Sequence, residues 1–586
     1  MVASATTGSL RQLPLRPTQA VLRRPISPIG AYDLQGIAFW HGSALALDSL
    51  RGQVLAVDLE TDAAEVLNPF HLDEFVGGQG LAVSPPIDGG PGEPTLWFCR
   101  DRSVYYCRLS DMAPRHFTKL PHEVDSVAVW QTTVYVSCSR TGKIHVLGRE
   151  TGQEITKFRA PGIGVENLTV RGEHLWVCDR LEQTVYCLDR ATGRLEFSVM
   201  TPYESPTGLA FWDGNSEVDP NENWEQSNGA APLYVCYSSE EAYIRDDPNA
   251  EDPLQLAFRD RTFLHALNFK WDRDRQLALS NGYLIEMFYV EEISALEAVD
   301  FSQLKNMEWR MAIPANTDRQ TVRQVVPVGL PFVEIEDSGQ RVAVFKFDSL
   351  EPGEGRLFGW KAIIEVRGIR YQLTPRSVEG LSPRLPEGYR EAYLMDNDDL
   401  AMDTPTVREA AVQSVGTETN ILRRMLSLRN YVYDRLSYRL TPKIDTPDVV
   451  LQRGIGSCGE YVGVLLAVAR LNGIACRTIG RYKCPQPGDR TGVNLFPDYN
   501  HVWIEFYVPG YGWLPMESNP DDIQEGGPYP TRYFMGLPWG HVEIAKGIRF
   551  QRLTVEGKLP EDGLSVGDLA MNHVRFKILE ELPLLA

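Results

Sequence analysis

The sequence lacks the short motifs and long apolar segments that identify many classes of protein. It has no His-Glu-x-x-His pair, no phosphate-binding loop and no Gly-x-Gly-x-x-Gly segment before a helix, so zincin, nucleotide and dinucleotide chemistry are not indicated. No apolar run is long enough to cross a membrane, and we expect no membrane partner. Residues 1–30 contain four arginines but no apolar stretch of the kind that a secretory signal needs.

Positive charge is also scarce. The chain has 58 Lys and Arg residues against 78 Asp and Glu residues, which gives a formal net charge of −20. Nucleic-acid binding requires a basic face, so we expect no nucleic-acid partner. The hydrophobic fraction of 43% is that of an ordinary globular protein. A chain of 586 residues is too long to fold around a single hydrophobic core, so its length predicts about three domains.

The nine cysteines show neither a disulfide pattern nor the Cys-x-x-Cys spacing of a zinc site. Six of them stand singly in strand-like segments: Cys99, Cys107, Cys138, Cys178, Cys187 and Cys236. Such cysteines are expected to be reduced and buried, because disulfides persist mainly in oxidising compartments. We therefore expect a cytoplasmic protein that holds no metal and no cofactor.

A repeat occupies residues 31–295. Strand-like segments begin at residues 36, 80, 126, 167 and 208, at intervals of 44, 46, 41 and 41 residues. Short strands at a fixed period of ~40–45 residues are typical of a β-propeller, in which each sheet is covered by its neighbours. A weaker unit near Leu267, after a polar insertion at residues 213–231, makes six blades the prediction. The arm at residues 1–30 could close the last blade.

Two further folded parts are expected after the repeat. Residues 325–380 contain several strand-like segments and predict a small antiparallel β-sandwich. Residues 400–555 begin with helical patterns and continue with mixed helix and strand signals, which predicts an α+β domain. The tail at residues 556–586 contains apolar residues and is expected to dock on the folded protein.

A helix is predicted directly after the glycine-rich residues 454–456, with Cys458 in its first turn. Apolar residues follow at helical spacing, and Ser457 and Glu460 fit a capping box that places the helix start at Ser457. Unpaired backbone N–H groups and the helix dipole at this end favour a thiolate over a thiol. Cys458 is therefore a candidate nucleophile. The alternative is a buried cysteine that acts as a small hydrophobic residue.

A histidine and a carboxylate follow on neighbouring predicted strands. His501 begins a β-branched and aromatic segment at residues 501–508, and a turn leads to a returning strand that ends at Glu517. A cysteine at a helix N-terminus, a histidine and a carboxylate on adjacent strands make a Cys/His/acid triad. Asn519 or Asp521 could replace Glu517, since their oxygens can also hold the histidine tautomer. Taken singly, His501 and Glu517 are also compatible with a structural histidine and a solvated charge.

Several motifs stand in a fixed order in this region. They are Gly456-Ser457-Cys458 with Glu460-Tyr461, residues 469–477, His501-Val502-Trp503-Ile504-Glu505, residues 509–513 and His541-Val542-Glu543-Ile544. Together they resemble the bacterial transglutaminase-like cysteine proteins, relatives of eukaryotic transglutaminases and peptide N-glycanases. The resemblance covers residues 446–520, with His541 in the closing strand, and implies Cys458, His501 and Glu517 as catalytic residues. The family usually has Asp where this chain has Glu517, and Glu is one methylene longer.

The repeat units resemble NHL-type or gluconolactonase-like propellers, since no Gly-His…Trp-Asp pair recurs in them. Some propellers of this kind bind a divalent ion in the central channel, where Glu166 or Asn167 could point. The expected fold class is therefore multidomain. It comprises an all-β six-bladed propeller, a small antiparallel β-sandwich and an α+β papain/transglutaminase-like core.

The resemblance implies acyl transfer or amide hydrolysis through a thioester on Cys458, with a protein or peptide as substrate. Whether an amine or water accepts the acyl group stays open. The propeller would recruit or gate this substrate, or bind a protein or small-molecule partner. The alternative is a non-catalytic scaffold in which the propeller binds a partner and the transglutaminase-like domain is degenerate.

Overall fold

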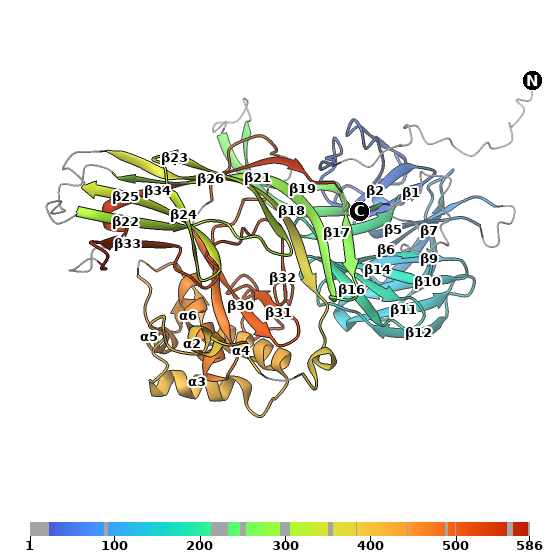
Figure 1. Cartoon of the computed structure of the whole chain (residues 1–586). Coiled ribbons are helices and arrows are strands. Elements are labelled where there is room, and N and C mark those ends of the chain that lie inside the picture. The colour runs from blue at the N-terminus through green and yellow to red at the C-terminus, as the bar shows by residue number, and fades with distance from the viewer. Residues whose placement is uncertain are drawn as a thin grey trace, which may run out of the picture. The chain divides into compact units, whose positions relative to one another are not determined.

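The computed structural model shows the chain as two compact units, Met1–Phe269 and Lys270–Ala586. The described residues are 23–86, 92–212, 232–246, 254–293, 305–349, 355–381, 384–441, 443–486, 490–497, 500–559 and 566–583. Strands dominate both units, and most of the helices belong to the second (Figure 1). Residues 1–22 of the predicted arm and the insertion at 213–231 lie outside the described residues.

The first unit contains five antiparallel sheets, each built from strands that follow one another along the chain. Four sheets have four strands and the fifth has three. The strands of the first two sheets are β1 (Leu34–Trp40), β2 (Ser43–Asp48), β3 (Gln53–Val57), β4 (Ala64–Val66), β5 (Gln79–Ser84), β6 (Thr95–Arg100), β7 (Ser103–Arg108) and β8 (Arg115–Lys119), with the short helix α1 (Leu72–Phe75) between them. The other three sheets contain β9 (Ser126–Trp130), β10 (Thr133–Cys138), β11 (Lys143–Gly148), β12 (Glu154–Arg159), β13 (Val165–Arg171), β14 (His174–Asp179), β15 (Thr184–Asp189), β16 (Leu195–Met200), β17 (Pro206–Phe211), β18 (Leu233–Asp246) and β19 (Leu254–Leu267).

The first strands of these sheets contact one another in a closed cycle, which we call the five-sheet ring. β1 contacts β5, β5 contacts β9, β9 contacts β13, β13 contacts β17, and β17 contacts β1 again. Apolar side chains fill the space between adjacent sheets; Leu47 of β2 and Phe98 of β6, for example, share one buried cluster. Ile26 pairs with Leu264 of β19 through two backbone hydrogen bonds of 2.8 Å. The segment before β1 therefore adds a fourth member to the fifth sheet.

The prediction of six blades is not confirmed, because the described residues of the first unit form five sheets. Leu267, the expected start of a sixth repeat, is the last residue of β19 and pairs with Leu233 in the fifth sheet. The next long strand, β21 (Leu277–Ile293), pairs with β26 (Arg356–Tyr371) in the second unit. The apolar pattern after Leu267 does belong to strands, but alternation alone does not tell which sheet a strand joins.

Asn167 and Glu166, considered above for a channel ion, lie on β13 of the five-sheet ring. The Asn167 amide donates to the backbone carbonyls of Gln35 at 3.2 Å and Thr207 at 3.3 Å. Asn167 therefore ties its own sheet to the first and fifth sheets. Burial, with smaller contributions from nearby carboxylates such as Asp125, raises the pKa of Glu166 to about 7.

A β-sandwich forms part of the second unit. One sheet has the order β20-β21-β26-β23, with β34 paired to β21 and β32 paired to β26, and the other has the order β24-β25-β22-β33. The strands not yet bounded are β20 (Phe269–Asp272), β22 (Lys305–Ala312), β23 (Gln320–Gly329), β24 (Val333–Asp337), β25 (Gln340–Ser349), β32 (Gly536–Leu537), β33 (Gln551–Val555) and β34 (Ala570–Glu581).

Aromatic side chains join the two sheets of the sandwich. The Phe358 ring of β26 lies 5.1 Å from Trp309 and 5.0 Å from both Phe345 and Phe347, which belong to the opposite sheet. The sandwich thus extends beyond the expected residues 325–380, since it begins before β22 and takes β33 and β34 from later in the chain. Such long-range pairing leaves no local signal in the sequence.

The α+β part of the second unit surrounds helix α6 (Cys458–Leu471). Its other elements are α2 (Tyr389–Tyr393), α3 (Pro405–Val415), α4 (Ile421–Arg435), β27 (Ser437–Tyr438), α5 (Pro447–Arg453), β28 (Ile455–Gly456), β29 (Cys476–Arg481), β30 (His501–Val508), β31 (Gly512–Met516) and, between β33 and β34, α7 (Val566–Leu569). Helix α6 contacts α3, α4, α5, β29 and β30, and most of its residues are buried. Figure 1 shows these helices gathered beside β30 and β31.

Strand β34 also reaches the segment that precedes His501. Leu495 and Phe576 exchange two backbone hydrogen bonds of 2.8 and 2.9 Å, and Gly492 donates to the Ile578 carbonyl at 2.8 Å. The tail at residues 556–586 therefore contributes a strand that links the sandwich to the α+β part.

Within the described residues, no helix combines the length and apolar character needed to span a membrane.

Candidate active site

Cys458 is the first residue of α6, and the residues around it fix its position. Glu460 Oε2 accepts the backbone N–H of Ser457 at 2.7 Å, as the predicted capping box requires. The same carboxylate group accepts hydrogen bonds from Thr441 at 2.8 Å and Arg453 at 2.6 Å. The buried Glu460 thus holds the start of the helix, and with it the thiol.

His501, the first residue of β30, lies beside this thiol. The Cys458 thiol donates to the carbonyl oxygen of Asn500 at 4.0 Å, and the His501 imidazole is near enough to lower the pKa of the thiol. His501 Nε2 lies 2.9 and 2.8 Å from the two carboxylate oxygens of Glu517. Nδ1 is therefore the ring nitrogen that remains for Cys458.

Glu517 directly follows β31 and has a side chain that is only 1% exposed. Besides His501, its carboxylate accepts the Ser518 backbone N–H at 3.1 Å and a hydrogen bond from Nε2 of a second histidine, His541. The Lys483 ammonium lies 3.8 Å away. The structure therefore brings together Cys458, His501 and Glu517, the three residues singled out in the sequence.

The electrostatics of the site favour a thiolate–imidazolium pair. Burial would raise the pKa of Cys458, but the hydrogen bond and charge of His501 outweigh it and lower that pKa below its ordinary value. Burial would lower the pKa of His501, but the charge of Glu517 and the hydrogen bond to Cys458 raise it. Burial also opposes ionisation of Glu517, yet His501, Lys483 and His541 hold its pKa well below the ordinary range.

His541 is a site residue that the sequence reasoning missed, since it was treated only as part of a closing strand. Its ring is buried and packs edge-on against Trp503, with centroids 4.9 Å apart. Burial lowers the pKa of His541 to about 4, so the imidazole is neutral near pH 7 and donates its Nε2–H to Glu517. One signal was available, because both histidines begin a His-Val-x-Ile pattern, at residues 501–504 and 541–544.

His501, Glu517 and His541 also offer three potential metal ligands, whose ligand atoms lie within 4.8 Å of one another. A divalent cation would have to replace both Nε2 protons. His541 Nδ1 would then carry the remaining proton, and this buried atom has no hydrogen-bond partner among the described residues. Metal-bound histidines normally donate that second N–H. The hydrogen-bonded arrangement therefore fits these residues better than a metal centre.

The alternative third residues have other partners. Asp521 accepts hydrogen bonds from Arg532 at 2.9 Å and Arg429 at 3.3 Å, and all three side chains are largely buried. The Asn519 side chain accepts a hydrogen bond from Ser518 Oγ at 2.9 Å. The structure therefore places Glu517, and neither of these two residues, against His501.

A thiol at a helix N-terminus, beside an imidazole that contacts a carboxylate, defines a Cys/His/acid site in an α+β fold. Comparison with family models agrees with this class. Residues 408–518 match the model described as the transglutaminase-like superfamily, and the match contains Cys458, His501 and Glu517. This part of the chain is therefore a transglutaminase-like domain, which confirms the resemblance found in the sequence.

Three solved structures show distant likeness. A candidate cysteine protease from Cytophaga hutchinsonii is 13% identical with a TM-score of 0.37, and the match covers 53% of this chain and 96% of that chain. The glutaminyl cyclase of Myxococcus xanthus and the calcium-binding protein regucalcin of Agrobacterium tumefaciens are each 15% identical with a TM-score of 0.27; each match covers 42% of this chain, and 96% and 97% of those chains. TM-scores of this size carry no functional argument. Comparison with curated proteins gives no match.

Proposed function

We propose that this chain is a cysteine-dependent enzyme that transfers the acyl group of an amide in a protein or peptide, or hydrolyses that amide. The observation that carries the proposal is the continuous line of buried contacts from the Cys458 thiol through His501 to Glu517. A degenerate domain would have no need to keep this set of ionisable side chains aligned in its interior, where unpaired charges are costly.

In the proposed mechanism, the Cys458 thiolate attacks the amide carbon, and the carbonyl oxygen becomes an oxyanion. The backbone N–H of Cys458 lies in the first turn of α6, where no intrahelical acceptor exists, and donates to that oxyanion. His501 gives its proton to the leaving nitrogen as the C–N bond breaks, which leaves a thioester on Cys458 and a free amine. His501 then removes a proton from the acceptor that attacks the thioester: water completes hydrolysis, and an amine completes acyl transfer.

The acyl donor is proposed to lie in a recess of about 830 Å³ that Asn500 helps to line. The Asn500 carbonyl oxygen is 4.0 Å from Cys458 Sγ, so one residue of the recess wall contacts the nucleophile. Its walls include Leu357 and Phe496, which are 52% and 66% exposed. The Arg575 guanidinium also lines it and lies 4.2 Å from the centre of the Phe288 ring. This combination suits a peptide with a large apolar side chain and a carboxylate near the reacting amide.

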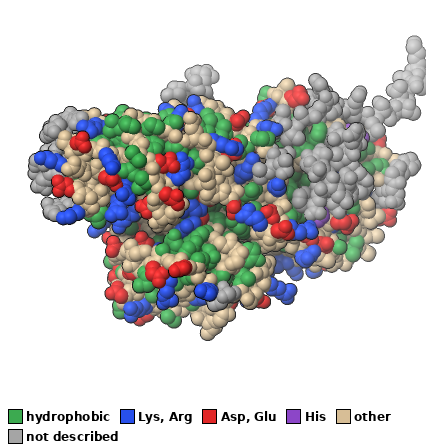
Figure 2. All heavy atoms as spheres, viewed as in Figure 1, with side chains coloured by type: hydrophobic (Ala, Val, Ile, Leu, Met, Phe, Trp, Pro, Cys, Tyr) green, Lys and Arg blue, Asp and Glu red, His purple; other side chains and the backbone are tan. Residues whose placement is uncertain are grey.

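The five-sheet ring is proposed to act as a propeller-like module that recruits or gates the substrate. On the face shown in Figure 2, acidic and basic side chains of the described residues are interspersed, which supports a protein or peptide partner over a nucleic acid. All nine cysteines are buried free thiols, and this supports a role in a reducing compartment such as the cytoplasm.

Alkylation by iodoacetamide tests the proposed function. Wild-type protein should take up one label, at Cys458, faster near neutral pH than a free thiol does. Cys458→Ser should remove this rapid label, because burial raises the thiol pKa of Cys476 and Cys484, the other two cysteines of this domain. His501→Ala should slow the reaction to the rate of an ordinary thiol. If wild-type Cys458 reacts no faster than a free thiol, the non-catalytic scaffold is the better description.

A reactive Cys458 would then allow the acceptor to be identified. Incubation with a peptide library should trap a thioester whose mass identifies the acyl donor. Addition of a primary amine distinguishes the two reactions, because a transferase incorporates the amine and a hydrolase releases the acid.

A further inference from the structure

Glu517 has one more imidazole partner than the proposed mechanism uses. Its side chain has three rotatable bonds where the Asp usual in this family has two, so a single hydrogen bond to His501 would leave it more freedom. His541 contacts the same carboxylate from a different segment of the chain. Two donors from different segments fix the orientation of a carboxylate better than one does.

His541 is itself held rigidly, and the groups that hold it belong to the sandwich. The His541 carbonyl accepts a hydrogen bond from Arg319 Nη1 at 2.7 Å, and the Pro538 carbonyl accepts one from Arg319 Nη2 at 2.7 Å. Arg319 Nε donates to the carbonyl of Arg367 in β26 at 2.8 Å, and Nη1 also lies 3.2 Å from Glu543. The Arg319 side chain is only 2% exposed. One buried guanidinium thus joins β26 to the segment that carries His541.

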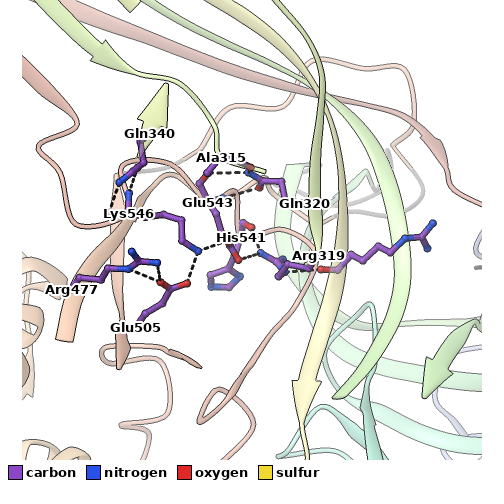
Figure 3. Close-up of polar contacts among 10 residues, drawn as sticks. Ala315, Arg319, Gln320, Gln340, Arg477, Glu505, His541, Glu543 and Lys546 are labelled. Carbon is purple, nitrogen blue, oxygen red and sulfur yellow. Dashed lines mark hydrogen bonds and ion pairs between the residues drawn. The ribbon is translucent and has the colours of Figure 1, made fainter. Parts of the chain in front are cut away.

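Two glutamines of the sandwich hold the same segment further along. Gln320 donates to the Glu543 carbonyl at 2.9 Å and accepts its backbone N–H at 2.8 Å. Gln340 makes a similar pair of contacts with the backbone of Lys546. Figure 3 shows Arg319, Gln320 and Gln340 around the residues from His541 to Lys546. Most of these contacts are made to backbone atoms, so they set the course of the chain.

We propose that His541 is a positioning residue that holds Glu517 against His501, and that the sandwich acts on the thiol through Arg319, His541, Glu517 and His501 in turn. The inference rests on the proposed function. It explains in physical terms how this chain can have the longer Glu517 where the family usually has Asp. Glu517 reaches far enough to contact two imidazoles, and the second imidazole replaces the constraint that a shorter Asp would supply.

The test compares rate constants of Cys458 alkylation between pH 5 and 9 in full-length protein. The variants are His541→Ala, His541→Gln, Glu517→Ala and the double variant of Glu517→Ala with His541→Ala. His541→Ala should slow the reaction at pH 6 about tenfold, because a loosely held Glu517 stabilises the imidazolium less well. His541→Gln should retain most of the wild-type rate, since its amide can donate to Glu517. In the Glu517→Ala background, His541→Ala should have no further effect.

Two results would overturn the inference while leaving the proposed function intact. One is a reactive wild-type Cys458 whose pH profile is the same in His541→Ala. The other is an equal effect of His541→Ala with and without Glu517, which would indicate a purely structural role. An unreactive wild-type Cys458 would instead refute the proposed function, and the inference with it.

A second measurement does not depend on reactivity, so it remains informative if one of the variants folds poorly. In protein labelled with ¹⁵N-histidine, the Nε2–H of His541 should give a resonance shifted far downfield by its hydrogen bond to Glu517. His541→Gln should remove this resonance, and Glu517→Ala should move it upfield. A signal unaffected by Glu517→Ala would contradict the contact. Saturable binding of Zn²⁺ that needs all three of His501, Glu517 and His541 would assign the site to a metal and overturn the positioning role.

Discussion

Replacement of Glu517 by glutamine tests the electrostatic core of the site. Gln has nearly the same size and removes only the charge that faces His501 and His541. Without this charge, the pKa of His501 falls and the imidazolium–thiolate pair becomes less favourable, so the apparent pKa of the Cys458 thiol rises. The direct repulsion between Glu517 and the thiolate acts in the opposite direction, but it is weaker than the effect of His501.

The size of the effect follows from the geometry. Glu517 lies 2.8 Å from His501 Nε2, and both side chains are at least 96% buried, with exposures of 1% and 4%. A hydrogen bond to a charged group contributes about 1.5–3 kcal/mol. Since 1.36 kcal/mol corresponds to a factor of ten, the thiolate population at pH 6 should fall about tenfold to a hundredfold. A Coulomb energy of about 4 kcal/mol at 4 Å and an effective dielectric constant of 20 is of the same order.

The assay is the rate constant of alkylation by iodoacetamide as a function of pH. Wild-type protein should react rapidly below the ordinary thiol pKa of about 8.5, and in Glu517→Gln the pH at which the reaction becomes rapid should lie about one to two units higher than in wild type. Glu505→Gln is a matched control, because Glu505 is also buried on β30 but pairs with Arg477 at 2.6 Å and Lys546 at 2.6 Å. The control should lower stability and leave the pH profile unchanged.

A Glu517→Gln profile that matches wild type would refute the electrostatic role of Glu517. An equal shift in Glu505→Gln would also refute it, since the effect would then come from general loosening of the domain.

Three more predictions follow from the same geometry. Burial lowers the pKa of His541 to about 4, against 6.5 in the unfolded chain, so the free energy of unfolding should fall as the pH drops below 6.5. Urea unfolding should show a loss of about 2 kcal/mol from this histidine between pH 7 and pH 5, and His541→Gln should lack this loss. Arg319→Lys removes most of the hydrogen bonds that tie β26 to the His541 segment, and should lower the free energy of unfolding by about 3 kcal/mol at constant m-value. Arg575→Gln should reduce kcat/KM about tenfold for peptides with a carboxylate near the reacting amide, and leave both the iodoacetamide rate and the activity on neutral peptides unchanged. The exposed Arg552 provides the control, because Arg552→Gln should leave kcat/KM unchanged for both kinds of peptide. An equal effect of both arginine variants would mean that the net charge of the protein, and not Arg575 itself, determines kcat/KM.

The start of α6 was predictable because its signals are local. Ser457 and Glu460 are three residues apart, and their hydrogen bond depends on little outside that turn. The motif order around Cys458 and His501 was equally visible, and it led to the transglutaminase-like domain that the family model also finds. Glu517 could only be ranked among three candidates, since one of the two arginines that occupy Asp521, Arg429, lies on a distant segment.

The remaining features depend on pairings that no local pattern records. Strand β21 has the alternation expected of a blade, but its partners are β26 and β34, and Tyr283 pairs with Glu581 almost 300 residues later. For this reason the prediction of six blades is not confirmed by the described residues. His541 was missed because its role exists only where Glu517 lies within reach, and that distance is set by Arg319 and the folded sandwich.

The position of β34 has a consequence for protein synthesis. Cys458, His501 and Glu517 leave the ribosome before β34, which begins 53 residues after Glu517 (570 − 517). Until β34 is made, Leu495 and Gly492 lack the backbone partners that anchor the segment leading to His501. A nascent chain therefore carries its thiol before the scaffold that aligns the imidazole is complete, and we expect the proposed reactivity of Cys458 only after the strand has paired.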